Sequence, residues 1–184
     1  MKKYLITSRE FYTDTPAIFR NILHEQLKEY LPDYALYRDK SNPNYAIQAA
    51  HFVDTCKQFE NIKSFIHQNI DMAKELDATG VHLTSKQIDL ITEAKAKGLE
   101  VIVSTHTKDE VLLSQKLGAD AVTYSPIFLS PNKGKPKGID DLKELLDVAN
   151  IKIFALGGVV EEKQIKKLKE TDVYGFASIR YFLN

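Results

Sequence analysis

The chain has 184 residues, a length that suits a single domain, and 43% of them are hydrophobic, which is enough for a buried core. Its 25 basic and 25 acidic side chains cancel, so no global field draws it to nucleic acid or to an anionic membrane, and any anion site has to be local. A single cysteine, with no signal-peptide pattern and no run of ~20 apolar residues, predicts a cytoplasmic protein without disulfides or a membrane span.

Short runs rich in β-branched or aromatic residues recur along the chain and predict strands. In order, they are Lys3–Thr7, Tyr34–Arg38, Ile62–Ile66, Gly80–Leu83, Val101–Ser104, Ala121–Tyr124, Ile151–Ala155 and Tyr174–Ser178. Between them, apolar residues repeat at helical spacing, as at Ile88 and Ile91, and predict seven helices. Strands that alternate with helices indicate a parallel sheet with right-handed crossovers.

Eight strands favour a (β/α)8 TIM barrel in which residues 1–184 form one domain. An open doubly wound sheet is the alternative if two of the short strands are loops. So few residues follow the eighth strand that we expect a short form of the barrel, lacking most of the last helix. Apolar surface near Tyr181–Leu183 is then expected to be uncovered, which favours pairing into a homodimer.

The strongest local signal is the pair Gly157-Gly158, between a predicted buried strand and a helix that begins near Glu161. Paired glycines let the backbone approach a ligand and point amides at it, and a helix N-terminus behind them favours phosphate. A plain tight turn is the alternative. In a barrel the balance shifts toward phosphate binding, because the loops after strands 7 and 8 are a frequent phosphate site.

Two other predicted strand ends carry arginine. Ser178 and Arg180 lie at the end of the eighth strand, where Arg180 can form a bidentate contact with the same phosphate. Arg38 and Lys40 lie at the end of the second strand, and alternation along a strand would turn both toward the ligand. An exposed arginine near the chain end and an ordinary charged turn are the respective alternatives.

The segment 125–138 is rich in proline and glycine and carries three lysines without an acidic residue. This composition suits a mobile lid over an anion, although a solvated basic loop fits it as well. His82 and His106 lie at the ends of the fourth and fifth strands, where either an acid–base or a structural role is open. No spacing indicates a zinc site or a dinucleotide loop.

Several motifs, in this order and at these spacings, resemble those of thiamine-phosphate synthases and their TenI-like relatives. They are Arg38-x-Lys40, Gly80-Val81-His82-Leu83, Ser104-Thr105-His106-Thr107, Gly118-Ala119-Asp120-Ala121-Val122, Pro126-Ile127-Phe128, Gly157-Gly158 and Gly175-Phe176-Ala177. The resemblance covers nearly the whole chain. It implies a barrel that joins hydroxymethylpyrimidine diphosphate to thiazole phosphate with Mg²⁺, in a dissociative reaction in which pyrophosphate leaves first.

The resemblance also implies roles for residues at matching positions. Catalytic roles are expected for Arg38, Lys40, Ser104, His106 and Lys133; phosphate binding for Gly157, Gly158, Ser178 and Arg180; and substrate contacts for Ser130, Asn132 and His82. Preorganised cations are needed because negative charge develops on the departing pyrophosphate.

The chain also departs from the family pattern. Gln68 and Gln87 stand where the family has its metal-binding aspartates, Leu36 replaces a glutamine, and Pro126 replaces the histidine of the tautomerases. Because Mg²⁺ prefers carboxylate oxygens, Mg²⁺ binding is expected to be greatly weakened.

The expected ligand is a small phosphate: thiazole phosphate, thiamine phosphate or pyrophosphate. Two alternatives to a synthase stay open. One is a catalytically silent relative that binds ligand as a sensor or partner subunit. The other is an unrelated phosphate-binding barrel, such as a sugar-phosphate isomerase.

Overall fold

In the computed structural model, which describes residues 1–131 and 133–183, eight parallel strands form a closed barrel. The strands are β1 (Lys2–Ile6), β2 (Tyr34–Tyr37), β3 (Lys63–His67), β4 (Gly80–Leu83), β5 (Glu100–Thr105), β6 (Ala121–Tyr124), β7 (Lys152–Leu156) and β8 (Gly175–Ser178). Each strand pairs with the next, and β8 returns to pair with β1. The TIM-barrel prediction is therefore confirmed, and the open sheet is wrong.

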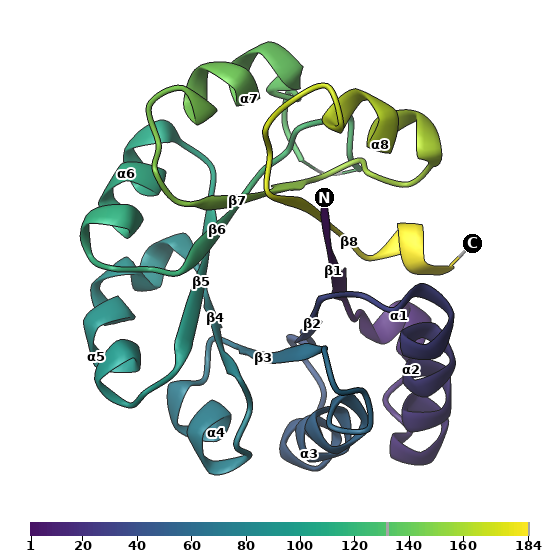
Figure 1. Ribbon diagram of the computed structural model, residues 1–184. Helices are drawn as coiled ribbons and strands as arrows, with labels where there is room; N and C mark the ends of the chain where they lie inside the picture. The colour runs from purple at the N-terminus through teal and green to yellow at the C-terminus, as the bar shows by residue number, and fades with distance from the viewer. Residues whose placement is uncertain (132, 184) are drawn as a thin grey trace.

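Helices surround the ring of strands on the outside (Figure 1). They are α1 (Arg9–Tyr12), α2 (Pro16–Tyr30), α3 (Tyr45–Cys56), α4 (Ile70–Glu75), α5 (Ile91–Ala96), α6 (Lys108–Lys116), α7 (Gly138–Leu146) and α8 (Glu162–Leu168). The seven helices α2 to α8 follow strands β1 to β7 in turn, as predicted, and α1 is an extra turn after β1. None of the helices in the described ranges has the length and apolarity needed to cross a membrane.

Side chains fill the barrel interior, because alternate residues of each strand point inward. On β5, for example, Ile102 belongs to the interior cluster and Val103 to the layer between strands and helices. Aromatic rings dominate the interior: the ring centroids of Tyr4 and Phe154 lie 5.1 Å apart, and those of Tyr34 and Phe154 lie 5.0 Å apart. The interior is therefore a packed core rather than a channel.

In the described residues, β8 is followed by a 3-10 turn, Arg180–Leu183. The expectation of uncovered apolar surface there is wrong for Phe182, which is fully buried. Its ring stacks on Phe176 at 5.9 Å and meets the edge of Tyr30, from α2, at 5.5 Å. Packing against α2 thus covers Phe182, and it removes this argument for a homodimer.

Two histidines occupy the upper part of the interior, near the carboxyl ends of β3 and β4. Burial, with the nearby charges of Arg38 and Lys40, lowers the pKa of His67 to about 4. Burial, with His67 and Arg38, lowers the pKa of His82 well below its ordinary value. Both rings are therefore neutral in the folded protein near neutral pH.

These two pKa values predict acid sensitivity. An unfolded chain takes up protons on histidine below about pH 6.5, whereas folded His67 stays neutral down to about pH 4. The contribution of these histidines to the free energy of unfolding should therefore be constant above about pH 6.5 and fall between about pH 6.5 and 4. Urea unfolding at several pH values would measure it. His67→Asn should flatten the dependence more than His24→Asn, at a partly buried position on α2. Equal slopes in all three proteins would contradict this account.

Candidate active site

A cavity of about 520 Å³ opens at the carboxyl ends of β7, β8, β1 and β2 and is bordered by the segment after β6. It gathers seven of the predicted site residues: Arg38, Ser130, Lys133, Gly157, Gly158, Ser178 and Arg180. Asn132 lies outside the described residues. The remaining predicted residues do not line this cavity.

A hydroxyl group joins the tips of β7 and β8. Ser178 Oγ donates to the carbonyl oxygen of Val159 at 2.7 Å and accepts from the amide of Tyr181 at 3.1 Å. The predicted convergence of these two strand ends is therefore present. Because a serine has one hydroxyl hydrogen, and Val159 takes it, Ser178 braces the two loops instead of donating to phosphate.

The glycine pair has left-handed backbone angles, with φ of 95° at Gly157 and 69° at Gly158. A Cβ at Gly157 would lie 2.8 Å from the Cα of Pro126, and one at Gly158 would lie 2.4 Å from the carbonyl oxygen of Leu129. Glycine is thus required because the segment after β6 packs directly on this turn. The amide of Phe128 donates to the Gly157 carbonyl at 3.0 Å and fastens that segment.

Within the described part of the chain, the same turn carries backbone donors without an acceptor, in residues that line the cavity. In the described ranges, the amides of Gly157, Gly158 and Val159 donate to no acceptor in the protein. Amides of successive residues in such a turn form a concave site for an anion. The glycine turn therefore serves packing and retains the donors that a phosphate needs.

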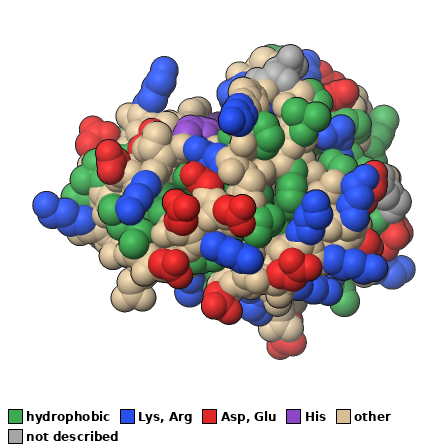
Figure 2. Space-filling view, turned by 90° about the horizontal axis from the view of Figure 1, so that it is seen from above, with side chains coloured by type: hydrophobic (Ala, Val, Ile, Leu, Met, Phe, Trp, Pro, Cys, Tyr) green, Lys and Arg blue, Asp and Glu red, His purple; other side chains and the backbone are tan. Residues whose placement is uncertain are grey.

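Arginine supplies the main positive charge. The side chain of Arg38 is half-buried, and no carboxylate within the described residues forms an ion pair with it. Burial lowers its pKa despite the nearby charge of Asp39. Arg180 and Lys133 stand exposed at the rim, and Glu10 is the one acidic residue in the described lining. Elsewhere the charges are mixed: acidic and basic side chains are interspersed on the face in Figure 2.

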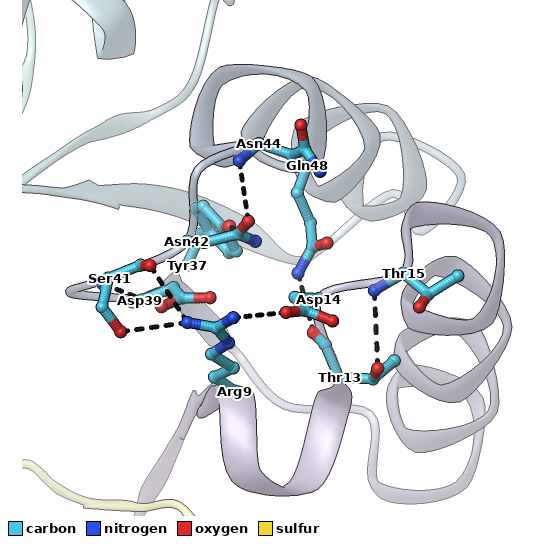
Figure 3. A network of polar contacts seen from close by, with 10 residues as sticks. All are labelled: Arg9, Thr13, Asp14, Thr15, Tyr37, Asp39, Ser41, Asn42, Asn44 and Gln48. Atoms are coloured by element: carbon cyan, nitrogen blue, oxygen red, sulfur yellow. Dashed lines mark hydrogen bonds and ion pairs between the residues drawn. The ribbon is translucent and has the colours of Figure 1, made fainter.

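A second arginine, Arg9 from α1, ties together the loops after β1 and β2 (Figure 3). Its guanidinium forms an ion pair with Asp14 and donates to the carbonyl oxygen of Ser41 at 3.0 Å and to Ser41 Oγ at 3.1 Å. The amide of Ser41 in turn donates to Asp39 at 3.2 Å. These contacts hold the loop that begins at Arg38.

Contrary to the prediction, Lys40 does not line the cavity with Arg38, although the charges of both side chains reach His67. It lines a separate hollow of about 710 Å³ with Asp39, His67 and Gln68, among others. The reason is that β2 ends at Tyr37, so the alternation of a strand does not extend over residues 38–40.

The two positions expected to hold metal carry neutral amides, and one of these is already engaged within the protein. Gln87 Nε2 donates to the carbonyl oxygen of Gln68 at 3.3 Å, and Gln87 Oε1 accepts from the amide of Thr84 at 3.2 Å. The Gln87 amide is therefore used in the turn after β4. Across residues 1–131 and 133–183, no group of three His, Cys, Asp or Glu side chains is arranged to hold a metal.

The predicted histidines differ in position. His82 is buried in the barrel, and its two ring nitrogens contact Tyr4 OH and Ser104 Oγ, both at 2.8 Å. Both nitrogens of His82 are thus engaged within the protein, so neither is free for the expected substrate contact. His106 is exposed, and its Nδ1 lies 3.2 Å from the carbonyl oxygen of Ser125, a cavity residue.

Sequence reasoning missed the contribution of the loop after β1. Ser8, Glu10 and Phe11 line the cavity, and Phe11 adds an exposed aromatic ring. No motif marks this segment, which reads as an ordinary polar connection. Only its position beside β8 in the closed barrel brings it to the site.

Comparison with known proteins agrees with the geometry. A family model described as thiamine monophosphate synthase matches residues 3–182. A putative thiamine-phosphate synthase 2 from Aquifex aeolicus is 34% identical over 121 residues, which cover 64% of this chain and 64% of that protein. The thiamine-phosphate synthase of Clostridium tetani is 34% identical over 127 residues, which cover 67% of this chain and 60% of that protein. The match thus spans less than two thirds of either relative's length.

A solved structure has the same architecture. Thiamine phosphate pyrophosphorylase from Pyrococcus furiosus superposes with a TM-score of 0.82 over 97% of this chain and 85% of that protein, at 24% identity. A thiamine-phosphate synthase from Vibrio parahaemolyticus, 31% identical over 142 residues, covers 72% of this chain and 67% of that relative. Because one family model matches the chain almost from end to end, this chain belongs to the thiamine monophosphate synthase family.

Proposed function

We propose that the chain binds phosphate esters of thiamine biosynthesis in the cavity between β7 and β8 and forms thiamine phosphate from hydroxymethylpyrimidine diphosphate and thiazole phosphate. The observation that carries the proposal is the meeting of unpaired backbone amides at residues 157–159 with an arginine, Arg38, that has no carboxylate partner in the described ranges. The names of the curated relatives support the choice of reaction.

The arrangement suits an anion for two physical reasons. Amides fixed by the glycine turn need no reorganisation when they meet phosphate oxygens. A half-buried guanidinium interacts more strongly with an anion than an exposed one, because less water screens the charge. Without a ligand, Arg38 carries the cost of partial burial with no partner, and a bound phosphate would offset that cost.

The proposed reaction breaks the bond between the pyrimidine methylene carbon and the diphosphate oxygen. The bonding electrons leave with pyrophosphate, and the thiazole nitrogen then forms the new bond to that carbon. The chain contributes positive charge from Arg38, with Lys133 and Arg180 at the rim, to stabilise the departing group. We propose no metal at Gln68 and Gln87, because the amide of Gln87 is already engaged.

A direct assay tests the proposed reaction. Purified protein is mixed with hydroxymethylpyrimidine diphosphate and thiazole phosphate, and thiamine phosphate is measured with and without Mg²⁺. Formation of thiamine phosphate supports a synthase. Calorimetric binding of thiamine phosphate without turnover would instead favour a ligand-binding relative. Absence of both binding and turnover would refute the proposal.

Removal of the arginines should weaken binding unequally. Arg38→Met should cost about 1.5–3 kcal/mol of thiamine phosphate or pyrophosphate affinity, the range for hydrogen bonds to charged groups. Arg180→Met should cost less than about 1 kcal/mol, because this side chain is exposed. Arg20→Met, on the outer surface of α2, is the matched control and should leave calorimetric affinity unchanged. A larger loss at Arg180 than at Arg38 would contradict this ranking.

Restoration of carboxylates should restore a response to metal. In the Gln68→Asp, Gln87→Asp double variant, formation of thiamine phosphate should rise with added Mg²⁺ more steeply than in the unaltered protein, since carboxylates are ligands that Mg²⁺ prefers. Gln58→Asp, at an exposed position after α3, controls for an added carboxylate. Identical Mg²⁺ titrations of all three proteins would show that the two glutamines do not account for weak metal binding.

A further inference from the structure

The loop after β1 brings a carboxylate, that of Glu10, into a cavity whose other charged lining residues are basic. Three cations share the described lining with it: Arg38, Lys133 and Arg180. In the part of the chain that the structure describes, the Glu10 carboxylate forms no ion pair and no hydrogen bond. Such a carboxylate repels a ligand that is only an anion, and it attracts the cationic part of a ligand that carries both charges. The charges of the lining therefore favour a ligand with a cation beside its phosphate.

The residue after Glu10 adds an aromatic ring. Phe11 lines the same cavity and is 37% exposed. Among the large hydrophobic side chains that are exposed in the described ranges, it is the one aromatic residue. The negative face of an aromatic ring attracts cations, and it also stacks on other flat rings. A carboxylate and an aromatic face in adjacent residues thus suit a flat ring that carries positive charge.

The short helix α1 holds these two residues at the cavity. Arg9, at its start, is tied by an ion pair and hydrogen bonds to the loops after β1 and β2, as Figure 3 shows. Tyr12, at its end, is fully buried. Residues three apart share one face of a helical turn, so Arg9 and Tyr12 anchor one face of α1. Glu10 and Phe11 lie on the other face, and both line the cavity.

The closed barrel places α1 between the two groups that are suited to an anion. Around the mouth, the strands follow one another in the order β7, β8, β1, β2. The glycine turn at residues 157–158 follows β7, and Arg38 follows β2. Glu10 and Phe11 follow β1, so they come between these groups in the ring, and all of them line one cavity. The turn therefore borders the space that separates the glycine amides from Arg38.

We propose that Glu10 and Phe11 bind the positively charged thiazolium ring of thiamine phosphate, while the basic groups of the cavity hold its phosphate. This inference deepens the proposed function and rests on it for the identity of the ligand. In the proposed reaction, the lone pair of the thiazole nitrogen forms the bond to the pyrimidine carbon, and the thiazole ring thereby becomes a cation. Glu10 and Phe11 therefore distinguish the charged product from the neutral ring of thiazole phosphate.

Calorimetry with two matched ligands tests this inference. Thiamine phosphate is compared with its thiophene analogue, in which a neutral ring of the same shape replaces the thiazolium. The unaltered protein should prefer thiamine phosphate, because an exposed ion pair and an exposed cation–π contact each contribute a factor of about two to five in affinity. Glu10→Gln and Phe11→Leu should each lower this preference by about that factor. Glu29→Gln, at an exposed position on α2 outside the cavity, is the matched control and should leave the preference unchanged.

Inorganic pyrophosphate, which carries no cation, separates a charge contact from general damage to the site. Glu10→Gln should weaken binding of thiamine phosphate, yet it should bind pyrophosphate as tightly as the unaltered protein or more tightly, because a repulsive charge is removed. Weaker binding of both ligands by Glu10→Gln, or an unchanged preference for thiamine phosphate over the thiophene analogue in either variant, would overturn the inference while the proposed function stands. Failure of the unaltered protein to bind both thiamine phosphate and pyrophosphate would refute the proposed function, and the inference with it.

Discussion

The pairing of β8 with both β7 and β1 is the constraint on which the site depends. Leu5 stands opposite Ser178 in the β1–β8 pair, and Leu156 stands opposite Ala177 in the β7–β8 pair. Closure of the barrel brings the segments after β1 and after β8 to the same end of the barrel, where both line the cavity. The Ser178 hydroxyl then ties the β8 tip to the loop after β7, so the amides of the glycine turn belong to a braced segment.

The glycine pair shows how one local conformation meets two demands. Its left-handed angles and missing Cβ atoms allow the segment after β6 to pack on the turn, as the contacts at Pro126 and Leu129 show. In the described ranges, the three amides of this turn have no acceptor, and their residues line the cavity. A change at Gly157 or Gly158 would therefore displace the covering segment and the donors together, so its effects on packing and binding cannot be separated.

The barrel interior is divided by chemistry. Aromatic rings such as Tyr34 and Phe154 fill its lower part, whereas Tyr4, His82 and Ser104 form a polar line toward the mouth. The line is electrically neutral, so it avoids the cost of a buried charge. In this family member, positive charge at the mouth comes from Arg38 and the rim, and the positions expected to hold a metal carry neutral amides.

By itself the sequence determined the order of strands and helices, because buried strands and amphipathic helices have different periodicities that short segments express locally. It also located the glycine turn and Arg38, since turn chemistry and charge are properties of a few adjacent residues. Only the tertiary structure decided that Lys40 lines a different hollow from Arg38, that Phe182 is covered by α2, and that Ser178 and His82 are braces within the protein. Each of these outcomes depends on contacts between residues distant in the chain, where closure of the barrel, and not local pattern, selects the partner.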